Sequence, residues 1–180
     1  MLLLYATRDG HSRRIALRIA DRLAESGIGA SPRDLAAAPL APAELAAAPL
    51  VALVAAVRYG RHLPEAEGFL ATHRSELARA PLVLVSVSLT ARKLGKDTAE
   101  GNPYLRKLIA RHRLKPALAA AVAGRLDYPR YRWLDRQIIR LIMKLTGGPT
   151  DPRGSFEFTA WEAVDAIAAR IAELMRQAEA

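Results

Sequence analysis

A polar loop near the N-terminus has the residue types of a phosphate-binding turn. It follows the apolar residues 2–6 and precedes an amphipathic stretch that we expect to be a helix. Hydroxyl groups at both ends of the loop, an internal glycine and a helix N-terminus would offer backbone N–H groups and a helix dipole to an anion. A simple strand-to-helix turn capped by Ser12 would use the same residues, so both interpretations are open. The loop consists of Thr7, Arg8, Asp9, Gly10, His11 and Ser12.

Two further polar segments follow apolar runs that we expect to be buried strands. Tyr59 and Gly60 come after residues 51–57. A tyrosine ring can lie flat on a planar ligand, and glycine lets the backbone approach it. Each segment alone could be a surface turn, but the carboxyl ends of parallel strands share one sheet edge, where ligands bind. The three segments together predict a site for a flat, phosphorylated ring such as FMN, and the last of them supplies Ser86, Val87, Ser88, Leu89, Thr90 and Ala91.

A basic and aromatic segment at about residues 125–153 is the other candidate for chemistry. From Trp133 its apolar residues recur at helical spacing. Like charges four residues apart repel each other, so we expect an anionic partner, either phospholipid head groups or the carboxylates of a substrate. A helix that only covers the sheet edge, with its arginines solvated, is the alternative. The cations at this spacing are Arg132, Arg136, Arg140 and Lys144.

Composition excludes several kinds of site. The net charge of +9 indicates an anionic partner or surface. The absence of cysteine excludes disulfides, thiolate metal sites and cysteine-ligated iron–sulfur clusters, so redox chemistry would need a bound cofactor. The four histidines lack metal-ligand spacing, and we expect no metal. The N-terminal apolar run is too short for a signal peptide, and no run reaches the roughly 20 residues of a membrane span. We therefore expect a cytoplasmic protein that could lie on a membrane without crossing it.

The order of the apolar runs predicts one α/β domain over residues 1–180. Parallel strands separated by helices should form a doubly wound sheet of five strands, with the basic segment inserted at the last strand. We expect strands at 2–6, 28–33, 51–57, 82–87 and 117–123, further extended structure at 156–159, and helices at 12–25, 42–48, 65–79, 103–113 and 160–177.

The chain resembles flavodoxin-like proteins and, among them, the family of menaquinone-dependent protoporphyrinogen IX dehydrogenases. The resemblance covers essentially the whole chain and implies a three-layer sandwich whose parallel sheet has the strand order 2-1-3-4-5. It depends on three segments, of which the last is the most specific. These are residues 7–10, residues 86–93 with their Ala-Arg-Lys ending, and the segment from Tyr128-Pro129-Arg130-Tyr131-Arg132-Trp133 to Gly147-Gly148.

This resemblance implies an FMN enzyme of haem biosynthesis. It would oxidise protoporphyrinogen IX to protoporphyrin IX and pass electrons to menaquinone or another quinone, as a peripheral protein on the inner face of the cell membrane. Residues 7–12 would hold the FMN phosphate, and Tyr59 and residues 86–91 would flank the flavin ring. No acid or base is identified. The expected contacts with substrate propionates or anionic lipid are Arg92, Lys93, Arg125, Arg130, Arg132, Arg136 and Arg140.

Two other functions fit the sequence. A flavodoxin-type electron carrier or a general FMN quinone reductase would use the same flavin loops, with the basic insertion as a docking surface for a partner. A non-enzymatic module that binds a membrane or nucleic acid through charge alone would not need the loop at residues 7–12. We expect no nucleic-acid partner, while the oligomeric state and the identity of the quinone are open.

Overall fold

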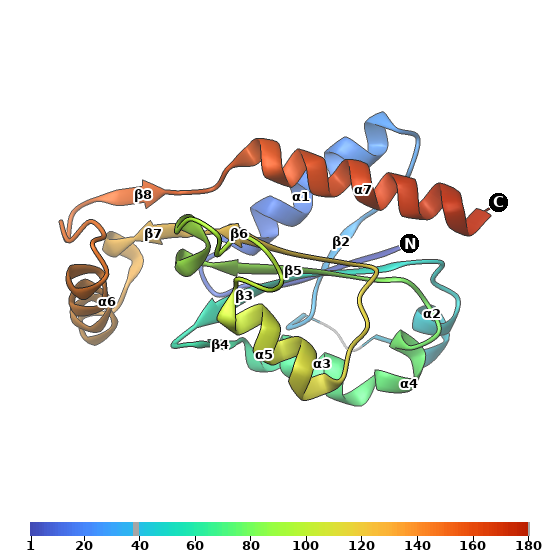
Figure 1. Cartoon of the computed structure of the whole chain (residues 1–180), viewed down its shortest axis with the longest axis horizontal. Coiled ribbons are helices and arrows are strands. Elements are labelled where there is room, and N and C mark those ends of the chain that lie inside the picture. The colour runs from blue at the N-terminus through green and yellow to red at the C-terminus, as the bar shows by residue number, and fades with distance from the viewer. Residues whose placement is uncertain (38–39, 180) are drawn as a thin grey trace.

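The computed structural model describes residues 1–37 and 40–179, and a parallel sheet forms its centre (Figure 1). The strands lie in the order β2-β1-β3-β5-β6, and the short β4 folds back antiparallel on β3. With β4 set aside, this confirms the predicted order 2-1-3-4-5. The strands are β1 (Leu2–Ala6), β2 (Pro32–Asp34), β3 (Val51–Arg58), β4 (Arg61–His62), β5 (Leu82–Ser88) and β6 (Leu118–Ala123).

Apolar side chains cover both faces of the sheet, which is why its central strands are continuous apolar runs. Leu4, Leu53 and Leu84 are register partners on neighbouring strands and pack in the core on one face. The residues that precede them in each strand belong to the core on the opposite face. The alternation of side chains along a strand thus supplies two cores from one set of apolar segments.

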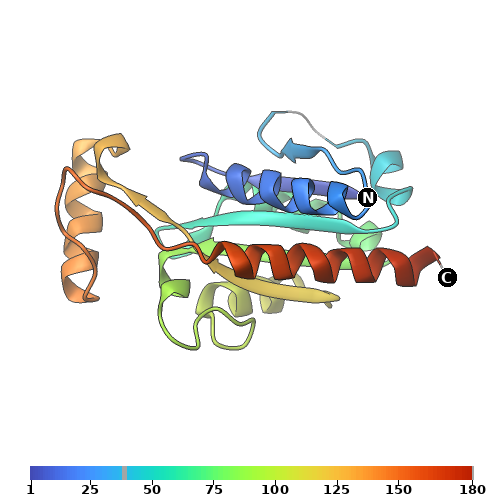
Figure 2. The ribbon, with the colours of Figure 1, turned by 90° about the horizontal axis from the view of Figure 1, so that it is seen from above.

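The helices form the two outer layers. One face of the sheet is covered by α1 (His11–Glu25) and α7 (Trp161–Glu179), which run side by side (Figure 2). The other face is covered by the remaining helices of the sandwich (Figure 1). These are α2 (Pro42–Ala46), α3 (Pro64–Thr72), α4 (Arg74–Leu77) and α5 (Pro103–His112).

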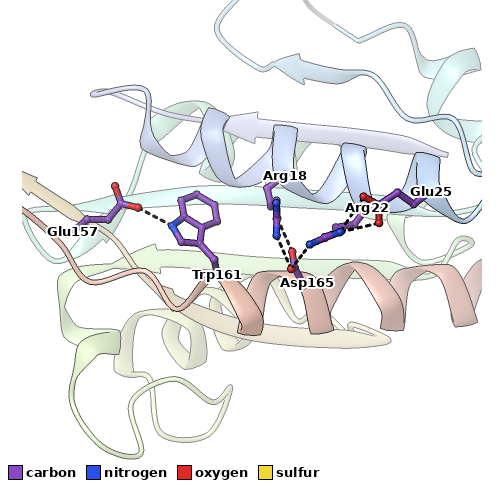
Figure 3. Close-up of polar contacts among 6 residues, drawn as sticks. All are labelled: Arg18, Arg22, Glu25, Glu157, Trp161 and Asp165. Atoms are coloured by element: carbon purple, nitrogen blue, oxygen red, sulfur yellow. Dashed lines mark hydrogen bonds and ion pairs between the residues drawn. The ribbon is translucent and has the colours of Figure 1, made fainter.

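Ion pairs join α1 to α7. The Asp165 carboxylate accepts two hydrogen bonds of 2.7 Å from Arg18 and one of 3.0 Å from Arg22 (Figure 3). These hydrogen bonds hold the pKa of Asp165 well below its usual range. At the start of α7, Trp161 is partly buried against the core, and its indole N–H donates to Glu157 over 2.8 Å.

The basic insertion leaves the sheet on a two-stranded antiparallel ribbon. Its strands are β7 (Arg125–Asp127) and β8 (Ser155–Glu157), and between them come the 3-10 turn η2 (Tyr128–Arg130) and α6 (Trp133–Leu145). The ribbon places α6 beyond the carboxyl ends of the strands, with its axis across the strand direction (Figure 2). The helix predicted from Trp133 is confirmed, and Gly147, at φ +68°, turns the chain back after it.

Two predicted elements differ from the structure. The second strand is shorter than predicted and starts at Pro32, the strand position where a missing N–H group is tolerated. The single helix predicted at 65–79 is divided at His73, whose backbone leaves the helical conformation at φ −105° and ψ 29°. Other boundaries shift by at most two residues. Within residues 1–37 and 40–179, no helix combines the length and the apolar content needed to cross a membrane.

Candidate functional site

A cavity of about 300 Å³ lies between α6 and the carboxyl edge of the sheet. The three polar segments singled out in the sequence meet there, since the crossover connections bring the ends of β1, β3 and β5 to the same edge. Fourteen of the candidate residues line this cavity. They are Thr7, Arg8, Asp9, His11, Ser12, Tyr59, Gly60, Val87, Ser88, Leu89, Thr90, Arg92, Lys93 and Arg125.

The loop before α1 has the geometry of an anion site. Gly10 precedes the helix in the left-handed conformation, at φ +82°, and donates its N–H to Thr7 Oγ1 over 3.0 Å. Ser12 does not cap α1, because it is the second residue of the helix. Its Oγ is buried and has no hydrogen-bond partner among the residues described. A buried hydroxyl group without a partner is costly, so a ligand atom would stabilise it.

His11 contributes a second unpaired atom to this end of the cavity. Thr159 donates its hydroxyl hydrogen to the Ala123 carbonyl over 2.7 Å and therefore accepts a hydrogen bond from His11 Nε2, also at 2.7 Å. This leaves His11 Nδ1 as a bare acceptor, buried and without a partner in the described part of the chain. Burial lowers the pKa of His11 to about 4, so its ring is neutral at pH 7.

The loop after β3 binds directly to α6. Tyr59 takes up the left-handed conformation at φ +50° and donates its hydroxyl hydrogen to Asp135, in the first turn of α6. Arg58 donates to the other oxygen of this carboxylate over 2.7 Å. The hydrogen bond from Tyr59 and the Arg58 charge lower the pKa of Asp135. The loop and the helix thus hold each other at the mouth of the cavity, and 56% of the Tyr59 side chain is exposed there.

The segment after β5 divides between the cavity and the core. Val87, Ser88 and the start of the 3-10 turn η1 (Leu89–Arg92) line the cavity. Ser86 instead pairs with His62 Nε2 at 2.8 Å in the interior, and Ala91 packs in the core behind the cavity wall. These two candidate residues, together with Gly10, do not line the cavity. Ser86 lies two residues before the end of β5, within the sheet, whereas Val87 and Ser88 lie at the end of the strand, beside the cavity.

A second, shallower hollow of about 700 Å³ adjoins the cavity and shares Tyr59 and Arg58 with its lining. Five arginines and two aspartates line it, and Arg58 forms ion pairs with both aspartates. The hollow therefore carries an excess of positive charge, which suits an anionic ligand. Its arginines are Arg8, Arg58, Arg61, Arg130 and Arg132.

The candidate cations are distributed over three places. Arg92, Lys93 and Arg125 line the cavity, and Arg130 and Arg132 line the arginine-rich hollow. Arg136 and Arg140 line neither, because they donate to the backbone carbonyls of Tyr131 and Thr150 at 3.2 and 3.1 Å. These two arginines hold the insertion together.

Sequence reasoning missed two groups of residues. Arg58 and Arg61 flank the Tyr59-Gly60 pair and could have been included from their position alone. The apolar wall that α6 presents to the cavity is the other group. Helical spacing could have indicated it, since Ile142 and Met143 lie three and four residues after Ile139.

Comparison with known proteins gives the same fold and a more specific relationship. Residues 2–153 match the flavodoxin domain family. The chain is 39% identical to protoporphyrinogen IX dehydrogenase (quinone) of Escherichia coli K12, over 96% of this chain and 94% of that protein. It is 40% identical to the Leishmania major protein of the same name, over 96% of this chain and 74% of that protein.

Solved structures support the fold alone. The flavodoxin 1 structure of Bacillus cereus matches with a TM-score of 0.54 and 12% identity, over 98% of this chain and 96% of that one. Rubredoxin:oxygen oxidoreductase of Desulfovibrio gigas matches with a TM-score of 0.60 and 13% identity, over 99% of this chain and 36% of that one.

Proposed function

Because this chain belongs to the flavodoxin domain family, and within it to the protoporphyrinogen IX dehydrogenases (quinone), we propose that it is an FMN enzyme that oxidises protoporphyrinogen IX. A quinone, menaquinone in the first instance, accepts the electrons, and the reaction belongs to haem biosynthesis. The observation that carries this proposal is the cavity itself, which has the unpaired hydroxyl group of Ser12 at one end and an apolar wall from α6 at the other.

The residues at the polar end fit the phosphate of FMN. Ser12 Oγ can donate to a phosphate oxygen, and the first N–H groups of α1 and its dipole favour negative charge there. The exposed ring of Tyr59 and the backbone around Leu89 would flank the isoalloxazine ring. FMN, when bound, supplies the two-electron redox chemistry that the side chains of a cysteine-free chain do not.

The arginine-rich hollow fits the other end of the substrate. Protoporphyrinogen IX combines two propionates with a large apolar macrocycle, so it needs cations beside apolar surface. The hollow supplies five guanidinium groups, and the cavity next to it supplies Ile139, Ile142 and Met143. Guanidinium groups bind carboxylates with paired hydrogen bonds, which would orient the macrocycle relative to the cavity.

The electron acceptor places the reaction at a membrane. Menaquinone is lipophilic and stays in the bilayer, so an enzyme that uses it would act at the membrane surface, as a peripheral protein on the cytoplasmic face. The net charge of +9 suits contact with anionic lipids on that face.

The test is anaerobic oxidation of protoporphyrinogen IX by the FMN-loaded protein, followed by porphyrin fluorescence with and without a menaquinone analogue. We expect a rise in fluorescence that depends on the quinone and that is absent from protein without FMN. No rise from protein with bound FMN would overturn the proposal. Quinone reduction without porphyrin formation would instead support a general FMN quinone reductase or an electron carrier.

A further inference from the structure

Most of the exposed large apolar side chains in the described part of the chain lie on α6. Six of the nine such residues belong to this one helix of 13 residues, and between 45 and 77% of each side chain is exposed. Single exposed apolar residues are common on protein surfaces, but a group of six on one helix indicates a binding surface. The six are Trp133, Leu134, Ile138, Leu141, Ile142 and Leu145.

The exposed residues form a continuous stripe along α6. Leu134, Ile138, Leu141 and Leu145 follow one another at intervals of four, three and four residues, which places them on one side of the helix. The opposite side faces the protein, where Met143 is buried and Ile139 packs against the small core of the insertion. The helix therefore has two apolar sides, and only one of them is covered by this chain.

The charges around the stripe are positive. Asp135 is the only acidic residue of α6, and its carboxylate turns inward to Arg58 and Tyr59. Arg132 precedes the helix and Lys144 lies in its last turn, and both side chains are exposed. The apolar stripe is thus flanked by cations, while the one acidic side chain of the helix pairs with residues of this protein.

An anionic bilayer fits this surface better than a second copy of the chain. Two copies meeting through α6 would bring together two molecules of net charge +9. A bilayer offers acyl chains to the leucines and phosphate groups to the cations at the same time. At 1.5 Å per residue the helix is about 20 Å long, which suits a helix lying in the interface and not one that spans the roughly 30 Å hydrocarbon core.

The exposed stripe also continues into the cavity. Ile142 is 45% exposed on the outside of α6 and at the same time lines the cavity wall beside Met143. An apolar molecule that leaves the bilayer along this edge would reach the cavity without crossing open water.

We infer that α6 docks this protein on an anionic bilayer, with Leu134, Leu141 and Leu145 in the acyl region, and that the Ile142 edge opens the cavity toward the membrane. The proposed docking depends only on the exposed surface of α6, whereas the use of this route by a quinone rests on the proposed function. The membrane contact is therefore made by the leucine stripe, with the cations at its border, and not by the row of arginines that the sequence suggested.

Cosedimentation of the full-length, FMN-loaded protein with lipid vesicles tests the docking. We expect binding to vesicles that contain phosphatidylglycerol and weaker binding to pure phosphatidylcholine. Replacing Leu134, Leu141 and Leu145 together with glutamine should weaken the partition coefficient at least about tenfold, since each leucine loses its transfer into the acyl region. Leu94→Gln is the matched control, because Leu94 is fully exposed and is not part of α6. Retained FMN absorbance reports that the variants are folded.

Two further measurements separate the contribution of the cations from that of the apolar stripe and test whether the helix enters the bilayer. Arg132→Gln and Lys144→Gln should each weaken binding to anionic vesicles about fivefold, with little effect on neutral vesicles. Trp133 fluorescence should shift to the blue on binding and be quenched by brominated lipid, and the Trp133→Phe variant should show neither change.

The route into the cavity needs a separate readout. The triple glutamine variant should reduce a water-soluble, short-chain quinone at the normal rate and lose the reduction of a long-chain quinone embedded in vesicles.

Wild-type protein that does not bind anionic vesicles, or a triple variant that binds them normally, would overturn the docking. A triple variant that changes a dimer to a monomer in light scattering, with vesicle binding unchanged, would assign the stripe to a second copy. Failure of porphyrinogen oxidation alone would overturn the proposed function and leave the docking standing.

Discussion

Arg58 Nη2 lies 2.7 Å from Asp135 Oδ2, and this ion pair joins the loop after β3 to the first turn of α6. Tyr59, the next residue in the loop, donates to the other oxygen of the same carboxylate. One aspartate of the insertion thus binds both residues of a loop that borders the cavity and the arginine-rich hollow. The position of the insertion over the site therefore depends on a contact between residues 77 positions apart.

Asp135→Asn should loosen α6 without unfolding the domain. The amide keeps the shape of the side chain but removes its charge, so the ion pair with Arg58 is lost. Because both side chains are partly exposed, we expect only a small fall in the free energy of unfolding. Hydrogen exchange measured by mass spectrometry should become several-fold faster in α6 and in the residue 58–60 loop.

Glu44→Gln is the control for this experiment, because it breaks the Arg33–Glu44 ion pair of 2.8 Å at the other end of the sheet. It should leave exchange in α6 unchanged. Equal protection of α6 in wild-type protein and Asp135→Asn would show that the small core of the insertion holds the helix without this ion pair.

Ser12→Ala should weaken FMN binding about 10- to 100-fold. The hydroxyl group of Ser12 is buried without a partner among the described residues, and a hydrogen bond to a charged group contributes about 1.5–3 kcal/mol. Quenching of flavin fluorescence gives the Kd. Riboflavin lacks the phosphate, so its affinity should not change, and this difference identifies the atom that Ser12 contacts.

Ser75→Ala serves as the control, since Ser75 is an exposed serine on α4 that donates to Glu76. It should bind FMN and riboflavin as wild-type protein does. Equal losses of FMN and riboflavin affinity in Ser12→Ala would contradict a phosphate contact.

The position of the three polar segments at one sheet edge was predictable because it depends on local sequence and connectivity. Apolar runs followed by polar residues locate the carboxyl ends of strands, and the parallel topology then brings residues 7–12, 59–60 and 87–90 together. No tertiary contact had to be known for this step. The strand order was implied by the resemblance to flavodoxin-like proteins, and not by this pattern.

The orientation of α6 was not predictable in the same way. Its helical pattern contains apolar residues on more than one side and a row of cations, and the sequence does not say which side meets the protein. In the folded chain, Arg136 and Arg140 donate to backbone carbonyls within the insertion, and Leu141 is exposed. This choice depends on where Tyr131 and Thr150 place their carbonyl groups, which is a property of the folded chain.

His62 should make the protein less stable as the pH falls below about 6.5. Its ring is buried against Ser86, and burial lowers the pKa of His62 to about 4. An unfolded chain has a histidine pKa of about 6.5, so between pH 6.5 and 4 the unfolded state takes up a proton that the folded state does not. The free energy of unfolding should therefore fall across this window, by up to about 3 kcal/mol from this residue.

Urea unfolding at several pH values between 7.5 and 4.5 checks this prediction. His62→Gln can keep a hydrogen bond to Ser86 and should reduce the pH dependence, so its stability should approach that of wild-type protein at low pH. His73→Gln is the control, because the His73 ring packs against Phe69 near the surface and should leave the pH dependence in place. Parallel curves for wild-type protein and His62→Gln would exclude His62 as a source of the dependence.

Arg61→Gln should raise the KM for protoporphyrinogen IX about tenfold and leave kcat nearly unchanged. Arg61 is exposed in the arginine-rich hollow, beside the cavity and outside the proposed flavin contacts. Loss of one guanidinium group removes a charge-assisted hydrogen bond to a propionate, while the macrocycle still reaches the cavity. An interaction that is equally strong in substrate and transition state changes KM and not kcat.

The measurement is the initial rate of porphyrin formation at several substrate concentrations. The dimethyl ester of the substrate has no carboxylates, so its KM should be the same for wild-type protein and Arg61→Gln. Arg74→Gln, on the distant α4, should behave as wild-type protein with both substrates. A similar rise in KM for the acid and the ester would assign Arg61 to the structure of the hollow and would leave the propionates to other cations.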